Sequence, residues 1–120
     1  QRELEISDGF FENDRWVISS TGVSYLTTSA QLGQKGNVVL YGHNTRDVLG
    51  GLWRVQVSDV VEVFDENGQV YKYEIFERKE VKPKAVEILD QTDDSRLTIF
   101  TCSGFLDTAR FVVVGKLVNL

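Results

Sequence analysis

Leu97-Thr98-Ile99-Phe100-Thr101-Cys102 is the stretch on which the interpretation of this 120-residue sequence rests. It is a strand-like run of apolar and β-branched residues that ends in the only cysteine of the chain and gives way to Ser103-Gly104. A second apolar run follows a short loop and opens with Arg110. The two runs predict an antiparallel hairpin in which Cys102 ends one strand and Arg110 begins the other.

Outward from this hairpin, the chain divides into short runs of β-branched and aromatic residues. We expect strands at 4–11, 16–18, 37–42, 60–64, 70–76, 96–101 and 110–118. The strands at 60–64 and 70–76 flank a segment that contains Asn67-Gly68, and Asn-Gly supplies the positive φ values that a tight hairpin needs. The small and polar segment 23–36 predicts a loop with at most one helical turn, and 84–89 predicts a short helical turn.

These elements predict an all-β fold. About seven or eight strands with mostly short connections and no long helix form a barrel or a sandwich, and we expect a closed β-barrel with one or two short helical turns. A chain of 120 residues suits one hydrophobic core but not two. Because no linker or internal repeat divides the sequence, residues 1–120 are expected to form a single domain.

Composition opposes several classes of function. The net charge of −5 argues against binding to nucleic acid, which depends on clustered Lys and Arg. No apolar run reaches the roughly 18 residues of a membrane span, and the chain begins with Gln1 instead of methionine, so we expect an excised domain without its membrane anchor or any signal segment. One cysteine and one histidine form neither an internal disulfide nor a zinc site, and neither a cofactor nor a metal is expected.

The hairpin also predicts chemistry at Cys102. Side chains that face each other across an antiparallel pair lie about 5 Å apart at Cβ, so the Arg110 guanidinium would favour the Cys102 thiolate and bind an oxyanion formed beside it. The lone histidine, His43, directly follows the apolar run at 37–42 and is suited to protonate a leaving amine. From spacing alone, a buried structural thiol and a surface histidine are still the commoner case.

At these residues the sequence resembles the sortase family of cysteine transpeptidases. Thr98-Ile99-Phe100-Thr101-Cys102 is similar to the family's Thr-Leu-x-Thr-Cys motif, with Ile99 in the leucine position, and Arg110 stands at the family's arginine. Gly36-Asn37-Val38-Val39-Leu40-Tyr41-Gly42-His43 is similar to the strand that delivers the family's histidine. The resemblance runs in register from about residue 22 to residue 118 and makes a catalytic Cys102 the favoured interpretation.

The resemblance implies an eight-stranded β-barrel and an enzyme that cuts a substrate protein at a C-terminal sorting motif. Cys102 would attack the scissile carbonyl to form a thioester, His43 would protonate the departing amine, and Arg110 would position the substrate and stabilise the oxyanion. An amine of cell-wall peptidoglycan or of a pilin-type subunit would then resolve the thioester. The substrate-binding residues implied are Thr101, Ser103 and Asn44.

We also expect a monomer on the extracytoplasmic, cell-surface face of the membrane, which it meets only through the missing anchor. Two alternatives stay open, a noncatalytic barrel that binds peptides and a cysteine peptidase that releases its product to water.

The sequence departs from the family in two places. The region before Gly22 lacks the proline-containing opening strand of many members, and Ser58-Asp59 replaces a common Gly-Asp pair and is expected to alter a turn.

Overall fold

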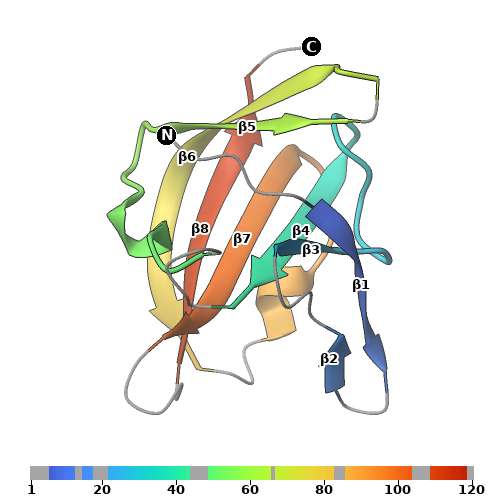
Figure 1. Cartoon of the computed structure of the whole chain (residues 1–120). Coiled ribbons are helices and arrows are strands. Elements are labelled where there is room, and N and C mark those ends of the chain that lie inside the picture. The colour runs from blue at the N-terminus through green and yellow to red at the C-terminus, as the bar shows by residue number, and fades with distance from the viewer. Residues whose placement is uncertain are drawn as a thin grey trace.

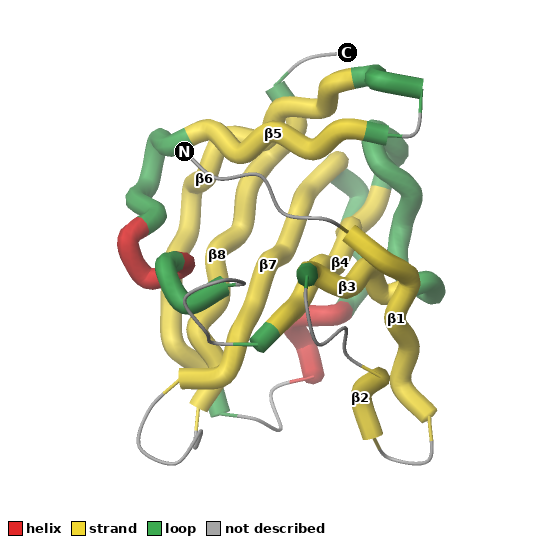
Figure 2. The backbone as a smooth tube through the Cα atoms, viewed as in Figure 1, coloured by secondary structure: helices red, strands yellow, loops and turns green. Residues whose placement is uncertain are grey.

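The computed structural model describes residues 6–12, 15–17, 22–43, 49–65, 67–82, 86–103 and 109–118, and these residues form one curled β-sheet with two short helices (Figures 1 and 2). The elements are β1 (Ile6–Glu12), β2 (Arg15–Val17), β3 (Val23–Leu26), β4 (Gly36–Gly42), η1 (Leu52–Arg54), β5 (Val60–Phe64), β6 (Val70–Val81), η2 (Val86–Leu89), β7 (Ser95–Ser103) and β8 (Ala109–Leu117). The strand order is β2-β1-β3-β4-β7-β8-β6-β5. The expected all-β, barrel-like fold is therefore confirmed, and both helices in the described part of the chain are single 3₁₀ turns.

The three central strands bring together residues that are far apart in the sequence. β4 runs parallel to β7, with Gly42 opposite Thr101, and β7 runs antiparallel to β8, with Cys102 opposite Arg110. The predicted hairpin is thus confirmed, including its register. Every residue of β4 is buried, as expected for a parallel strand that is covered on both faces.

Alternate residues of the central strands pack into two apolar clusters, one on each face of the sheet. The first cluster contains Val38, Leu40, Leu97, Ile99 and Val113, together with residues of β3, β5, β6 and the chain around η1. The second cluster contains Leu26, Val39, Tyr41, Phe100, Val112 and Val114. Ile88 and Leu89 of η2 pack against the second cluster, so the connection between β6 and β7 covers that face.

Two sequence predictions need correction. The loop predicted for 23–36 is wrong at its start, because residues 23–26 form β3, which pairs with both β1 and β4. Ser24 is fully buried in that strand. Because serine is polar, the sequence pattern did not indicate a buried strand here. β6 is also longer than the predicted strand at 70–76, because it continues to Val81 across a bulge between Ile75 and Glu77.

Among the described residues, Gly33, Gly36, Ser58 and Gly68 have positive φ values. In the confirmed hairpin between β5 and β6, Gly68 has a φ of 81°, and Asp65 Oδ1 accepts hydrogen bonds of 2.9 Å from the backbone N–H groups of Asn67 and Gln69. Ser58, before β5, has a φ of 82°. This left-handed region strains residues that carry a Cβ atom, whereas glycine enters it freely.

Candidate active site

The three residues predicted to be catalytic lie at the same end of three neighbouring strands. His43 directly follows β4, Cys102 is the last residue but one of β7, and Arg110 is the second residue of β8. Adjacent strands are about 4.8 Å apart. The strand order and register therefore bring these three backbone positions within two strand spacings of one another.

The structure describes the side chains of His43 and Arg110. His43 is exposed, whereas Arg110 is half-buried and donates from Nη1 to the carbonyl of Ala109 at 3.2 Å. None of the ion pairs between described residues engages Arg110.

The other predicted site residues are described only in part. For Cys102 and Ser103 the structure describes the strand backbone, and Asn44 lies outside the described residues. The catalytic role of Cys102 and the substrate contacts of Ser103 and Asn44 stay predictions.

Thr101 ties the end of β7 to the end of β4. Its hydroxyl donates a hydrogen bond of 2.8 Å to the carbonyl of Gly42, and Thr101 is only 3% exposed. Because the two bonded residues directly precede Cys102 and His43, this bond fixes the distance between the two strand ends. The substrate contact expected of Thr101 stays a prediction. Its hydroxyl group already donates its hydrogen bond to Gly42 within the sheet.

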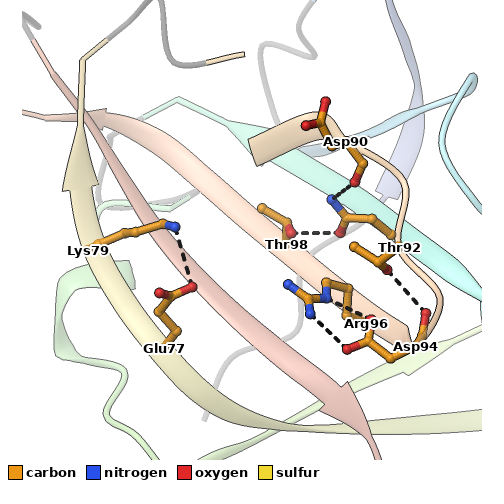
Figure 3. Close-up of polar contacts among 8 residues, drawn as sticks. Glu77, Lys79, Asp90, Thr92, Asp94, Arg96 and Thr98 are labelled. Carbon is orange, nitrogen blue, oxygen red and sulfur yellow. Dashed lines mark hydrogen bonds and ion pairs between the residues drawn. The ribbon is translucent and has the colours of Figure 1, made fainter. Parts of the chain in front are cut away.

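Thr98, the other threonine of the motif, has a matching role. Its hydroxyl donates a hydrogen bond of 2.7 Å to Asn37 Oδ1, and Asn37 Nδ2 donates to the carbonyls of Ile88 at 2.9 Å and Asp90 at 3.2 Å. Figure 3 labels Thr98 and Asp90, two of the hydrogen-bond partners of this amide. Asn37, which is 2% exposed, therefore fastens η2 and the residues after it to β4.

Sequence reasoning missed Asn37. The available signal was an amide at the start of an otherwise apolar strand run, because a buried side-chain amide persists only where its hydrogen bonds are satisfied. Gln91 completes the fastening, since its side chain accepts from the Asn37 N–H at 3.0 Å and donates to the Asn37 carbonyl at 3.2 Å.

An ion pair holds the end of the same connection. Arg96 donates from Nε and Nη2 to the two carboxylate oxygens of Asp94, each at 2.8 Å (Figure 3). These hydrogen bonds lower the pKa of Asp94 to about 2. The Arg96 guanidinium carbon also lies 5.3 Å from the ring centroid of Phe76. The pair is therefore ionised at neutral pH and secures the entry into β7.

The strand ends rest on apolar packing. Tyr41 and Phe100 stack in the second cluster, with ring centroids 5.5 Å apart and an interplanar angle of 16°. Burial raises the pKa of Tyr41 to about 12, so its phenol stays protonated at neutral pH.

In the described ranges, no group of three or more His, Cys, Asp or Glu residues is arranged to hold a metal ion.

A cavity of about 650 Å³ lies on the face of the sheet that carries the first apolar cluster. It is lined by residues that include Tyr25, Val38, Leu40, Phe64 and Tyr71. Val38 and Leu40 belong to the first cluster, whereas Tyr41 belongs to the second. None of the described residues that line the cavity is a predicted site residue, so the cavity is not part of the candidate active site.

Comparison with known proteins gives the family. The model of the sortase domain matches residues 2–118. The chain belongs to the sortase family. It is 37% identical over 94 residues to sortase A of Listeria monocytogenes serovar 1/2a, a match that covers 74% of this chain and 41% of that protein. It is 28% identical over 110 residues to sortase A of Bacillus anthracis, covering 84% of this chain and 52% of that protein.

This sortase-family chain thus spans about half the length of the curated relatives it matches. Its fold is similar to the solved structure of a sortase D5 transpeptidase from Clostridium perfringens, with a TM-score of 0.74 at 26% identity, covering 81% of this chain and 62% of that chain. Within the described residues, no helix has the length and apolar character needed to cross a membrane.

Proposed function

We propose that this chain is the catalytic part of a cysteine transpeptidase, which cuts a surface protein at a C-terminal sorting motif and joins the cut end to an amine. The observation that carries the proposal is the register that sets Cys102 opposite Arg110, beside the strand that ends at His43. Membership of the sortase family and similarity to a transpeptidase of that family support the reaction class.

The first half of the reaction cuts the substrate. The Cys102 thiolate attacks the scissile carbonyl carbon, a sulfur–carbon bond forms, and the carbonyl electron pair moves onto oxygen. Arg110 donates hydrogen bonds to this oxyanion. The carbon–nitrogen bond then breaks, and His43 gives a proton to the departing amine, which leaves an acyl group attached to Cys102 as a thioester.

The second half forms the new amide bond. An incoming amine attacks the thioester carbon, Arg110 again binds the oxyanion, and neutral His43 accepts the proton that the amine loses. The carbon–sulfur bond breaks and returns the thiolate. The amine comes from cell-wall peptidoglycan or from a pilin-type subunit.

The hydrogen bonds around these strand ends support such a mechanism because catalysis depends on a fixed spacing of the reacting groups. Thr101 fastens β7 to β4 one residue before the proposed nucleophile. Asn37 fastens η2 over the second face of the sheet. We expect η2 to form a preformed wall beside the substrate, on the face of the sheet that carries the second apolar cluster.

Family membership also supports the setting that we propose. Residues 1–120 would act as one catalytic domain and as a monomer at the extracytoplasmic face of the membrane. Its macromolecular partners would be substrate proteins that carry a sorting motif, and nucleic acid would not be among them. The net charge of −5 agrees with the last point.

Product analysis tests the function. The domain is incubated with a panel of sorting-motif peptides, with and without an amine such as triglycine. The products are identified by their masses in mass spectrometry. A ligated product that requires both the amine and Cys102 is the expected result. Release of hydrolysed peptide at equal rates with and without amine would make the chain a peptidase. Binding without cleavage would make it a noncatalytic barrel.

A further inference from the structure

The chain that leaves His43 returns to the core through η1. The Leu49 N–H donates to the carbonyl of His43 at 3.0 Å, and the Leu52 N–H donates to the carbonyl of Leu49, also at 3.0 Å. Leu49 and Leu52 are 8% and 5% exposed and belong to the first apolar cluster. The position of η1 therefore restricts the backbone on which His43 stands.

Arg78 of β6 holds the C-terminal end of η1. It donates from Nη2 to the carbonyl of Trp53 at 2.6 Å and from Nε to the carbonyl of Val55 at 3.0 Å. The N–H of Gln56, which would otherwise extend the helix, donates instead to Asp59 Oδ2 at 2.8 Å. A cation is favoured beside such unpaired helix-end carbonyls, and a two-pronged donor fixes orientation as well as distance.

The same side chain also reaches β8. The guanidinium carbon of Arg78 lies 5.3 Å from the ring centroid of Phe111, which directly follows Arg110 and is opposite Thr101. Figures 1 and 2 show η1 beside β6. Arg78 therefore links the helix after His43 to the strand that carries Arg110.

We propose that Arg78 is a positioning residue for His43. By clamping η1 through the two carbonyls, it holds Leu52 and Leu49 in place and, through the hydrogen bond from the Leu49 N–H to the His43 carbonyl, keeps the imidazole near the end of β7. Arg78 does not itself contact substrate. The kinetic part of this inference rests on the proposed transpeptidase function, whereas the clamp on the loop can be measured without any activity.

Amide hydrogen exchange tests the clamp in Arg78→Gln. The N–H groups of Leu49, Leu52 and Val55 are expected to exchange about tenfold faster, because losing hydrogen bonds from a charged donor raises the population of the open loop. Arg54→Gln is the matched control. It removes an exposed arginine of the same helix, whose guanidinium carbon lies 5.1 Å from the Trp53 ring centroid, and should leave these exchange rates within about twofold.

Kinetics and NMR then test the link to His43. In Arg78→Gln we expect kcat for the sorting peptide to fall about tenfold with KM unchanged, because the substrate contacts are intact but the proton donor is less well placed. Arg78→Lys, which keeps the charge without the fork, should give an intermediate kcat. The ring-proton signals of His43 should shift in Arg78→Gln but not in Arg54→Gln. The melting temperature of each variant is measured to confirm that it is folded.

Three results would overturn the proposal. The first is unchanged exchange at the three amides in Arg78→Gln, the second is an equal effect of Arg54→Gln, and the third is faster exchange without any change at His43. If the wild-type domain shows no turnover, the proposed function fails. The exchange rates and the His43 signals still decide the role of Arg78 in that case.

Discussion

The hydroxyl of Thr101 donates a hydrogen bond of 2.8 Å to the carbonyl of Gly42 across the parallel pair of β7 and β4. The next residue on each strand is a proposed catalytic residue, Cys102 on one and His43 on the other. One buried side chain thus sets the spacing between the proposed nucleophile and the proposed proton donor. The second threonine of the motif has a structural role that its position in the sequence does not reveal.

Thr101→Val should therefore impair both stability and turnover. The substitution keeps the shape but leaves the carbonyl of Gly42 without its partner, which costs about 1–3 kcal/mol of unfolding free energy. Loosened strand ends should lower kcat/KM by at least about tenfold. Thr101→Ser keeps the hydroxyl and should lose only about 1 kcal/mol through the missing methyl group. Urea unfolding and peptide turnover measure both effects. A valine variant as stable and active as the serine variant would contradict this role.

Arg110→Lys tests the proposed oxyanion contact. Lysine keeps the positive charge but cannot present two parallel donors, so we expect the domain to fold normally and kcat/KM to fall by about a hundredfold or more. Arg54→Lys is the same change at an exposed arginine of η1 and should leave turnover unchanged. Circular dichroism checks folding and product mass measures the rate. Near wild-type turnover in the Arg110 variant would mean that charge alone is sufficient.

Some features of this chain could be predicted from sequence because their signals are local. The hairpin of β7 and β8 follows from two apolar runs separated by a short polar loop, and its register follows from where each run ends. Strand β3 was missed because its residues are buried by the neighbouring strands β1 and β4. Its own sequence does not alternate between apolar and polar residues in the way that marks a strand. Arg78 was missed because its partners are backbone carbonyls, such as that of Trp53, and carbonyls carry no sequence signature. The buried amide of Asn37 could have been noticed, but its carbonyl partners, such as that of Ile88, could not have been named.

The ion pair of Asp94 and Arg96 predicts a specific pH dependence. The pKa of Asp94 is lowered from 3.8 to about 2, so its carboxylate stabilises the folded state fully above about pH 4 and loses this contribution as the pH falls through about 2. The difference in unfolding free energy between wild type and Asp94→Asn should be constant between pH 7 and about pH 5 and shrink in acid. Because the Asp94 side chain is 30% exposed, the effect should be modest.

Asp93→Asn is the control for this pH dependence, since it removes the exposed neighbouring carboxylate. Urea unfolding at several pH values gives the comparison. A gap between wild type and Asp94→Asn that grows as the pH falls would contradict the assigned pairing.

Ser58→Gly should stabilise the protein. With a φ of 82°, Ser58 bears the cost of a left-handed backbone, about 1–2 kcal/mol, and glycine removes it while adding roughly 0.5–1 kcal/mol of chain entropy to the unfolded state. A net gain of about 0.5–1 kcal/mol is expected in urea unfolding. Val57→Gly, at the preceding turn residue, lacks this relief and should destabilise. An unchanged or lower stability in Ser58→Gly would show that the serine makes a compensating contact.

The most direct test of the account is the mass of the intact protein after mixing with a sorting-motif peptide library in the absence of an added amine. We predict that the wild-type domain gains the mass of an acyl fragment, that hydroxylamine removes it as expected of a thioester, and that Cys102→Ala gains none. Identical masses for wild type and Cys102→Ala across the whole library would contradict the claim that Cys102 is the nucleophile.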